Sequence, residues 1–495
     1  MSSVAEQTFH RLAGEKAADL AHRNTIHRAI DTYDAAVAAG RARFADWETA
    51  RQRCHDIKQE AISHLDRYLE EFEANVERRG GKVFWASDAE QACTYVAGLA
   101  SARGVKQVVK SKSMITEEIH LNAVLQKQGV DVLETDLGEY IVQLRGEPPY
   151  HILTPAMHLN RAQIADLFRE RLPQEFSAPR PGNKDGLTQI QTAQVSSNPP
   201  EAEVYPGESH GELVAVARRA LRREFFSADM GISGANFLVA DAGMVAISTN
   251  EGNGRLCTTL PRIHVVLASI EKVIPHLQDL AILWPVLTTA GTGQRITTYS
   301  TLIGGPRTPQ EIDGPEEFHV VLLDNGRSRL LADSEQREVL HCIRCGACLN
   351  ACPVFRNIGG HAYGTVYSGP IGSVLTQHLN GPGGFQHLSS ASTLCGNCNT
   401  VCPVKIDLAH HLLHNRRNSV NAGDRPWQER LAMRCWRWAM LSEGRYRLAG
   451  RLARTMLRTF GDLGLSILRP WTACRQLPTA PKLSFRQMWR NDGSR

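Results

Sequence analysis

Four cysteines followed by a proline constrain the folding of this chain more than any other feature of its sequence. Cys342, Cys345, Cys348 and Cys352 form a C-x2-C-x2-C-x3-C run, which Pro353 follows. This is the ligand spacing of iron–sulfur clusters in bacterial ferredoxins. Two-residue spacings let three sulfurs surround one inorganic core on a tight turn, and the proline disfavours continued helix at the preceding cysteine. The run therefore predicts a helical segment that carries a cluster.

A second, shorter motif follows about forty residues later and ends in Pro403. In ferredoxins with two clusters, the fourth cysteine of each run is a ligand of the other cluster. The expected ligands of cluster 1 are therefore Cys342, Cys345, Cys348 and Cys402, and those of cluster 2 are Cys352, Cys395 and Cys398.

The second motif is short of one cysteine, and Ser392 stands at the corresponding position. Three interpretations remain open: a three-iron (3Fe-4S) cluster, a four-iron (4Fe-4S) cluster with an oxygen or outside ligand, and a four-iron cluster with an exchangeable site. Zinc is the alternative to iron. Zinc sites usually take two separated pairs of ligands, which explains a run of four cysteines poorly.

The chain has 495 residues, which suits two or three domains. Its net charge of +5 and the lack of a concentrated basic face before the C-terminal tail argue against nucleic acid as a partner. The N-terminus shows no apolar signal segment, and the longest apolar stretches are too short to span a bilayer. A cytoplasmic location is expected, where clustered cysteines favour metal ligation over disulfides.

The rest of the chain divides into segments of different pattern. Residues 1–80 are expected to form two or three N-terminal helices, because residues 9–79 have almost no Gly or Pro and show helical apolar spacing. Residues 81–328 alternate short apolar strands with helical stretches, which predicts an α/β domain with a mainly parallel sheet. Residues 329–420 are assigned to an α-helical, ferredoxin-like domain and residues 421–495 to a basic amphipathic helical tail.

Local patterns give the expected elements. Strands are predicted at residues 83–85, 105–109, 130–133, 141–144, 237–240, 245–248, 264–268 and 319–323, and helices at residues 89–102, 117–127, 161–171 and 406–418. Residues 177–206 are rich in Pro, Gly, Asn and Ser, which predicts a loop.

Long unusual runs give the chain a family resemblance. They include KSKSMITEEIHLN (residues 110–122), TNEGNGRLCTTLPRIHVV (residues 249–266) and LCGNCNTVCPVKIDL (residues 394–408). With these runs the sequence resembles the lactate utilization protein B family over most of residues 10–420. The resemblance implies a lactate-utilisation (LUD) domain, related to CoA-transferase and sugar-isomerase folds, fused to a domain with two iron–sulfur clusters. It also implies a part in oxidising L-lactate to pyruvate as one subunit among three.

On this resemblance the seven cysteines carry over as cluster ligands, and the gap at Ser392 is a family trait. The chain is expected to transfer electrons within an L-lactate-oxidising complex of sister subunits, passing them to a quinone or another carrier. Two alternatives are retained: acyl or CoA transfer by the α/β domain, and an iron–sulfur redox sensor. No G-x-G-x-x-G fingerprint stands between a strand and a helix, which argues against a nicotinamide dehydrogenase.

Two segments suit a substrate carboxylate. Lys110, Ser111, Lys112 and Ser113 lie between a predicted strand and helix, where hydroxyl and backbone donors suit an anion. In the Gly-rich stretch of residues 250–255, Asn253 and Arg255 are further candidates, since arginine can hold a carboxylate through two bonds. The alternatives are a helix cap for the first segment and a tight turn with a salt bridge for the second.

Other residues are given simpler interpretations. Cys257 is a redox thiol, the missing cluster ligand or, as we favour, a buried packing residue. The acidic group formed by Glu134, Asp136 and Glu139 is expected to consist of surface carboxylates that cap a turn, with a general base or metal site as the alternative. The histidines at positions 151, 158 and 264 are treated as structural. The basic, Trp-rich tail predicts docking within the protein or on a partner, with peripheral contact at the inner face of the membrane as the alternative.

Overall fold

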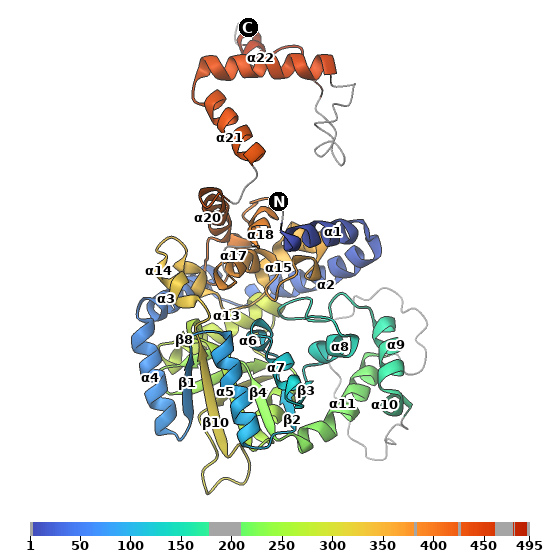
Figure 1. Ribbon diagram of the computed structural model, residues 1–495, viewed down its shortest axis with the longest axis vertical. Helices are drawn as coiled ribbons and strands as arrows, with labels where there is room; N and C mark the ends of the chain where they lie inside the picture. The colour runs from blue at the N-terminus through green and yellow to red at the C-terminus, as the bar shows by residue number, and fades with distance from the viewer. Residues whose placement is uncertain are drawn as a thin grey trace. The chain divides into compact units, whose positions relative to one another are not determined.

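The computed structural model describes residues 3–177, 209–380, 384–423, 427–460, 479 and 481–492 (Figure 1). Almost all of the loop expected at residues 177–206 lies outside these ranges. Contacts divide the chain into two compact units between Arg417 and Asn418. The domain boundaries expected at residues 80 and 328 fall inside the larger unit and stay a prediction.

The chain begins with four helices, α1 (Val4–Ala18), α2 (Leu20–Arg41), α3 (Trp47–Ser63) and α4 (Leu65–Arg78), where two or three were expected. Asp19 explains the additional boundary, because its side chain accepts a hydrogen bond from the His22 N–H and caps α2. The apolar faces of α3 and α4 pack into the largest core of the protein.

A six-stranded, wholly parallel sheet forms the centre of the larger unit. Its spatial order is β1 (Lys82–Ala86), β10 (Glu317–Leu323), β7 (Ile263–Ser269), β4 (Met230–Ser233), β2 (Gln107–Lys110) and β3 (Asp131–Glu134). Helix α5 (Ala89–Ala102) packs on β1 and β10 (Figure 1). Every residue of β7 is buried, as is typical of parallel strands covered on both faces. The predicted α/β fold with a mainly parallel sheet is confirmed.

A second sheet of four strands stands beside the first. Its order is β8 (Val273–Ile274), β5 (Phe237–Val239), β6 (Met244–Thr249) and β9 (Tyr299–Ile303). Strand β5 pairs in parallel with β8 and antiparallel with β6, which pairs antiparallel with β9. Strands β4, β8 and β9 were not predicted. Two of them have four residues or fewer, too few for a period-two pattern to stand out.

The strand predicted at residues 141–144 is wrong, because these residues belong to helix α8 (Leu137–Arg145). The Asp136 side chain caps its first turn by accepting bonds from the backbone N–H groups of Gly138 and Glu139. Gly146 ends the helix in the left-handed conformation, with φ of 69°. The short apolar run at residues 141–144 predicts a strand only when these two boundary signals are left out of account.

The remaining helices cover the sheets or build the cysteine region. Those of the α/β part are α6 (Met114–Glu118), α7 (Leu121–Lys127), α9 (Arg161–Arg171), α10 (Pro173–Ser177), α11 (His210–Ser227), α12 (Asn253–Thr259) and α13 (Leu280–Thr292), with the short 3-10 helices η1 (Ile270–Lys272) and η2 (Leu277–Asp279). Those of the cysteine region are α14 (Arg327–Ala332), η3 (Arg337–His341), α15 (Ala347–Ala351), α16 (Pro353–Ile358), η4 (His361–Tyr363), α17 (Gly369–Leu379), α18 (Gln386–Ser390), α19 (Asn397–Val401) and α20 (Leu408–Asn421). The cysteine region is thus helical, as predicted.

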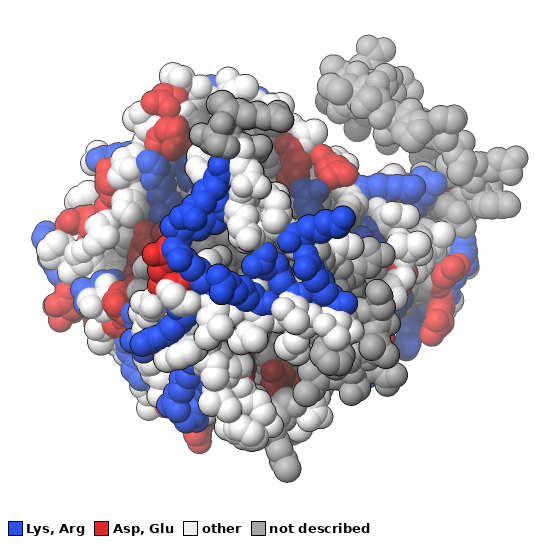
Figure 2. All heavy atoms as spheres, turned by 90° about the horizontal axis from the view of Figure 1, so that it is seen from above, with Lys and Arg blue, Asp and Glu red and all other residues white. Residues whose placement is uncertain are grey.

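The C-terminal unit contains α21 (Trp427–Met440), α22 (Glu443–Phe460) and α24 (Phe485–Asp492). Helices α21 and α22 pack against each other, and the Arg445 guanidinium lies 5.0 Å from the ring centre of Trp438. Large apolar side chains such as Trp427 and Trp436 are exposed. Figure 2 shows a band of basic side chains on the face seen from above. Among the residues described, no helix is both long and apolar enough to cross a membrane.

Candidate functional site

Four cysteines from the two motifs line one small cavity. Cys342, Cys345 and Cys348 come from the first run, and Cys402 joins them from the second. The rest of the wall is mostly apolar and includes Ile152, Ile371, Val404 and Ile406. Crossed ligation of a cluster requires this arrangement, so the four sulfurs could hold one iron–sulfur core away from water.

The sulfurs around this cavity are strongly desolvated. Cys345, Cys348 and Cys402 are each at most 8% exposed. Burial raises the pKa of Cys402 to about 12, and it raises the pKa of the Cys345 and Cys348 thiols as well. Without metal these thiols keep their protons at neutral pH. Binding of iron to them would therefore release protons.

The other three cysteines form a second group that lies nearer to solvent. Burial, followed by the neighbouring charges of Cys352 and Cys395, raises the pKa of Cys398 to about 11. Cys395 is exposed, whereas Cys352 and Cys398 are buried. Three sulfurs thus approach one another at a site with one open side.

A left-handed glycine precedes the helix in each motif. Gly346, with φ of 76°, begins α15, and Gly396, with φ of 79°, begins α19. A side chain at position 346 would press on His151 and Leu153 at about 3.2 Å. Helices α15 and α19 also pack against each other, which brings the two motifs together. The glycines therefore serve the turn that lets the sulfurs converge.

A larger cavity of about 360 Å³ opens where strands of the two sheets end. Ser111, Lys112 and Ser113 follow β2, and Asn253 begins α12 after β6. Ligands of open α/β sheets bind at the carboxyl ends of parallel strands. The structure therefore brings together three of the five predicted substrate residues, Ser111, Ser113 and Asn253, with Lys112 beside them.

The cavity holds polar atoms that find no partner among the described residues. They are the Lys112 Nζ, the Ser113 Oγ, the Asn253 Oδ1 and one terminal nitrogen, Nη1, of Arg344. Buried polar atoms are normally hydrogen-bonded, so a group of this kind indicates a bound partner. Because two of these atoms belong to cationic side chains, an anion is favoured.

Titratable groups on the same wall have shifted pKa values. Burial lowers the pKa of Lys272 to about 8. Glu251 as a whole residue is exposed, but its carboxyl group faces the cavity wall, where partial desolvation and then the nearby Asp136 charge raise its pKa to about 7. Perturbed pKa values inside a cavity are common at functional sites.

Two predicted substrate residues lie outside this cavity. The Lys110 Nζ is buried in ion pairs with Glu117 at 2.8 Å and with Glu134 at 2.5 Å. Arg255 is exposed, and its guanidinium lies 5.6 Å from the ring centre of Tyr299. Lys110 therefore supports the end of β2, and Arg255 points away from the site.

Two residues line both cavities. Ile152 and Arg344 belong to the wall of the four-cysteine cavity and also to the wall of the larger cavity. Arg344 stands between Cys342 and Cys345 in the sequence, and its backbone N–H contacts the Cys342 sulfur at 3.4 Å. A molecule bound in the larger cavity would therefore lie one side chain away from the place of cluster 1.

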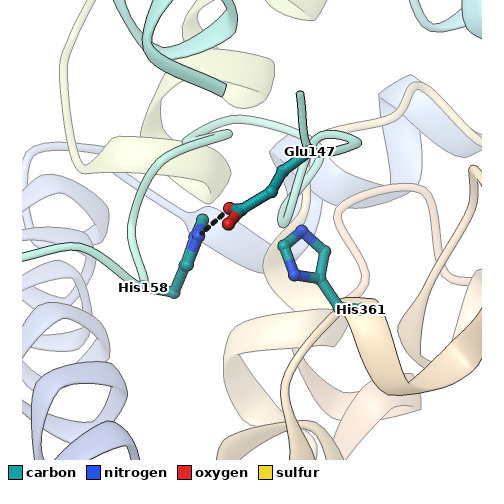
Figure 3. A group of neighbouring side chains, drawn as sticks. All are labelled: Glu147, His158 and His361. Atoms are coloured by element: carbon teal, nitrogen blue, oxygen red, sulfur yellow. Dashed lines mark hydrogen bonds and ion pairs between the residues drawn. The ribbon is translucent and has the colours of Figure 1, made fainter. Parts of the chain in front are cut away.

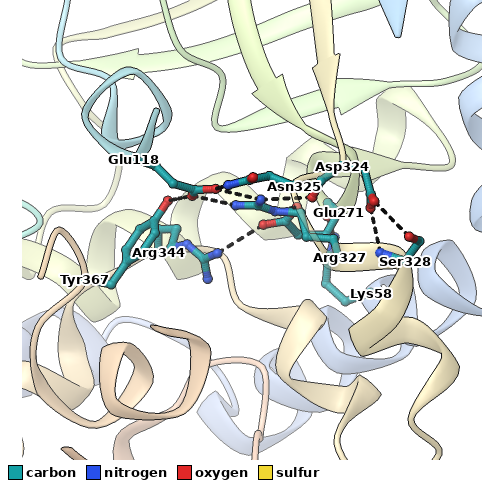
Figure 4. A network of polar contacts seen from close by, with 9 residues as sticks. All are labelled: Lys58, Glu118, Glu271, Asp324, Asn325, Arg327, Ser328, Arg344 and Tyr367. Atoms are coloured by element: carbon teal, nitrogen blue, oxygen red, sulfur yellow. Dashed lines mark hydrogen bonds and ion pairs between the residues drawn. The ribbon is translucent and has the colours of Figure 1, made fainter. Parts of the chain in front are cut away.

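A network of buried charges fixes this shared wall (Figure 4). Glu271 forms ion pairs with Arg344 at 3.0 Å and with Arg327 at 2.7 Å. Arg327 also pairs with Glu118 at 2.8 Å, and the Tyr367 hydroxyl donates to Glu118 at 2.7 Å. These residues come from both the α/β part and the cysteine region, so the network fixes the two parts relative to each other.

Arg344, Lys272 and Tyr367 were not predicted as site residues. Lys272 lies shortly after the apolar strand β7 and before the apolar pair Val273–Ile274. A charged residue in such apolar surroundings is the only local sign that it has a function. Arg344 lies between Cys342 and Cys345, so the motif draws attention to the cysteines and gives no sign that the arginine lines the larger cavity.

The acidic group at the end of β3 differs from its prediction. Glu134 and Glu139 are 4% and 3% exposed, so they are not surface carboxylates. Glu134 pairs with Lys110, and burial raises the pKa of Glu139 to about 8. Asp136 alone acts as the expected cap.

Cys257 and the histidines have structural surroundings. Cys257 is fully buried in a core cluster separate from the one that holds the cluster cysteines, and its sulfur lies 3.2 Å from the Thr135 hydroxyl. The buried His264 shares a hydrogen bond of 2.8 Å with Ser233. His151 accepts a bond from the backbone N–H of Leu153 at 3.1 Å.

His158 takes part in a polar group that joins two regions (Figure 3). Glu147 and His158 lie 3.0 Å apart, and His361 of the cysteine region points toward them. The carboxylate of Glu147 also pairs with Arg145 at 2.7 Å, and His361 contacts the Pro148 carbonyl at 2.8 Å. These partners account for the group as a polar contact between the α/β part and the cysteine region.

Comparison with known families agrees with this division. The family profile described as "LUD domain" matches residues 69–323, and the profile "4Fe-4S dicluster domain" matches residues 338–406. The profile "Lactate utilisation protein B, C-terminal" matches residues 414–494. The chain is therefore an α/β LUD-domain protein joined to an iron–sulfur dicluster region, and its two groups of cysteines support two iron–sulfur clusters.

Individual relatives give the family. Lactate utilization protein B of Bacillus subtilis is 42% identical over 450 residues, which cover 90% of this chain and 88% of that protein. The protein of the same name from Bacillus thuringiensis is 38% identical and covers 99% of this chain and 98% of its own length. The chain belongs to the lactate utilization protein B family. A crystal structure of a DUF162 family protein from Deinococcus radiodurans aligns with a TM-score of 0.25 and 12% identity, too low to bear on the fold.

Proposed function

We propose that this protein is the iron–sulfur electron-transfer subunit of a complex that oxidises L-lactate to pyruvate. The observation that carries the proposal is the wall shared by the four-cysteine cavity and the larger cavity, through Ile152 and Arg344. Oxidation of lactate releases two electrons and two protons. An anion site that touches a cluster site gives these electrons a short path into the protein.

In this proposal the larger cavity receives a small carboxylate or the group that exchanges electrons with it. The unpartnered Lys112 Nζ and Arg344 Nη1 supply positive charge, and Ser113 and Asn253 supply hydrogen bonds. Lys272, with a pKa near 8, stays mostly protonated at neutral pH and adds to the positive charge of the cavity. Ile152 contributes apolar surface to the wall between the two sites.

The proposed ligands are Cys342, Cys345, Cys348 and Cys402 for cluster 1, and Cys352, Cys395 and Cys398 for cluster 2. Four-iron clusters of this kind exchange single electrons when bound. The proposed cluster 1 site shares a wall with the larger cavity. The exposure of Cys395 supports a cluster 2 site near solvent, where a partner would collect electrons. Sister subunits and a quinone or another carrier are the proposed partners.

The test is reduction of the anaerobically purified full-length protein by L-lactate in the presence of its sister subunits. We expect lactate to bleach the charge-transfer absorbance of the clusters and to produce an electron paramagnetic resonance signal. Lys112→Met should weaken this response, because it removes a cation from the cavity, whereas the matched Arg255→Met should leave it unchanged. No bleaching with all subunits present would reject the proposal.

Acyl or CoA transfer by the α/β domain is the second proposal, because Glu139 and Glu251 near the cavity are candidate carboxylates with raised pKa values. Calorimetric binding of CoA would favour it. A redox sensor is the third, based on the open side of the cluster 2 site. Cluster loss in air with a change in partner binding would favour that role.

The C-terminal unit is proposed to dock on a sister subunit or on the inner face of the membrane. The exposed tryptophans of α21 lie among arginines, and α22 carries further arginines beside exposed leucines, a composition that suits an anionic or amphipathic partner. Flotation with anionic vesicles would distinguish the two: the protein should float with the vesicles if it docks on a membrane, and should not if it docks on a sister subunit.

A further inference from the structure

The two cysteine motifs have the same backbone. In the first, Arg344 and Gly346 adopt left-handed φ values of 59° and 76°, and in the second Leu394 and Gly396 adopt 54° and 79°. Helices α15 and α19 follow, each of five residues. Cys352 and Cys402 then end these helices in extended conformations with ψ of 118°. Such agreement makes residues 342–352 and 392–402 a structural repeat.

The repeat extends to hydrogen bonds. In α15 the N–H of Leu349 donates to the Gly346 carbonyl at 3.0 Å, and in α19 the N–H of Asn399 donates to the Gly396 carbonyl at the same distance. The register therefore places Ser392 where the first motif has Cys342.

One side-chain contact is repeated at this position. The backbone N–H of Arg344 donates to the Cys342 Sγ at 3.4 Å, and the backbone N–H of Leu394 donates to the Ser392 Oγ at 3.1 Å. A left-handed residue supplies the N–H in both cases. The hydroxyl of Ser392 thus has the orientation, relative to its own loop, that the cluster 1 ligand has in the first loop.

Arg416 holds the backbone of this loop in place. Its guanidinium donates to the Ser389 carbonyl at 2.9 Å and to the Ser392 carbonyl at 2.8 Å. Ser392 itself is only partly exposed. Its position is therefore fixed by the fold.

The neighbouring polar side chain of Asn399 already has partners. Its carbonyl oxygen Oδ1 accepts from the Ala409 N–H at 2.9 Å and from the Cys398 Sγ at 3.5 Å, and its amide donates to Asp407. Cys257 lies in a separate core cluster. Among the described residues of the second loop, Ser392 occupies the backbone position that corresponds to Cys342 of the first loop, and its Oγ is the atom available to bind iron there.

We infer that the Ser392 Oγ is the fourth ligand of the second cluster. The inference rests on the proposed assignment of Cys352, Cys395 and Cys398 to that cluster. On ligation the Ser392 O–H bond breaks, an iron–oxygen bond forms and the proton leaves to solvent, with no change in oxidation state. Alkoxide is a harder ligand than thiolate, so it favours the oxidised form of the cluster and lowers its reduction potential relative to a cluster with four cysteines.

The test uses the full-length protein, purified without oxygen, in the wild-type form and as Ser392→Cys, Ser392→Ala and Thr393→Ala. The measurements are iron content, Mössbauer spectra and potentiometric electron paramagnetic resonance. We expect the wild type to hold two four-iron clusters. Ser392→Cys should keep both and raise the potential of one, and Ser392→Ala should convert one to a three-iron cluster or lose it. The exposed Thr393→Ala is the matched control and should resemble the wild type.

The outcomes separate this inference from the proposed function. A second cluster whose spectra and potential are the same in the wild type, Ser392→Cys and Ser392→Ala would overturn the serine ligand. A three-iron cluster already present in the wild type would also overturn it. If Ser392→Ala does not fold, an unchanged potential in Ser392→Cys still decides against it. A wild-type protein without iron–sulfur signals would instead reject the two-cluster assignment itself.

Discussion

The two cysteine sites share a backbone and differ in surroundings. The first is closed: four cysteines line a small cavity with an apolar wall, beside a buried charge network. The second is open: it has three cysteines, and Cys395 is exposed. One local fold is thus used in two environments. Burial and neighbouring charge, rather than the loop itself, are expected to set how each cluster behaves.

On the proposed function the two sites would have different tasks. The closed site adjoins a cavity that suits an anion, so its surroundings would serve the entry of electrons. The open site, with the exposed Cys395, would serve their exit.

The largest effect is expected from removing one ligand of each site. Cys348→Ala should abolish cluster 1 and its reduction by lactate, whereas Cys398→Ala should abolish cluster 2 and leave cluster 1 reducible. Iron content and electron paramagnetic resonance of both variants, with sister subunits present, would measure this. Loss of the same signal in both variants would contradict separate sites.

The next largest effect concerns the charge network beside the closed site. Glu271→Gln leaves Arg327 and Arg344 without full compensation, and breaking a buried ion pair costs about 3–5 kcal/mol. The denaturant concentration at the unfolding midpoint should fall accordingly, and the absorbance of cluster 1 should be lost before that of cluster 2. The control is Glu335→Gln, which removes the exposed pair with Arg417 and should change stability little. Equal effects of the two substitutions would show that the network does not hold this wall.

A smaller difference is expected in the response to a chelator. Because Cys395 is exposed and the cysteines of the closed site lie behind an apolar wall, the second cluster should lose iron several times faster than the first. Time-resolved resonance spectra under anaerobic chelation would follow both clusters. Faster loss of the buried cluster would refute the contrast.

A further effect, of comparable size, is the pH dependence of anion binding in the larger cavity. Lys272, with a pKa near 8, loses its positive charge as pH rises, and Glu251, with a pKa near 7, gains a negative charge over the same range. Both changes weaken binding of an anion such as pyruvate. A charged hydrogen bond contributes about 1.5–3 kcal/mol, so affinity should fall roughly tenfold or more from about pH 6 to about pH 9.

Calorimetry across this pH range would measure the loss of affinity. Lys272→Met and Glu251→Gln should each flatten the profile, because each removes one titrating group. An affinity that rises with pH in the wild type would contradict the assignment of these groups to the anion site.

The fold was predictable where the pattern was long. The alternation of strands and helices gave the parallel sheet, and helix α9 was predicted at its observed bounds. Helix α8 was missed because its signals are the Asp136 cap and the left-handed Gly146, which a short apolar run conceals. Strands β8 and β9 depend on pairing with β5 and β6, partners that no local pattern reveals.

The candidate site was predictable to the extent that its chemistry is local. Cysteine spacing predicted both groups, since most ligands of one cluster lie in one short motif and the closing cysteine of the other motif completes the set. The anion cavity was found only in part: Ser111 and Ser113 were predicted, but Lys110 turned out to be tied to Glu117 and Glu134. Arg344 and Lys272 reach the cavity from other parts of the chain, and only the tertiary fold brings them there.

The position of Arg344 in the common wall has an electrostatic consequence. Its positive charge favours the reduced, more negative form of cluster 1, and an anion in the neighbouring cavity would neutralise part of that charge. We expect pyruvate to lower the midpoint potential of this cluster in a redox titration, with no shift in Arg344→Gln. When the product leaves, the midpoint potential of cluster 1 would rise again, so the cluster would accept electrons more readily in the next turnover.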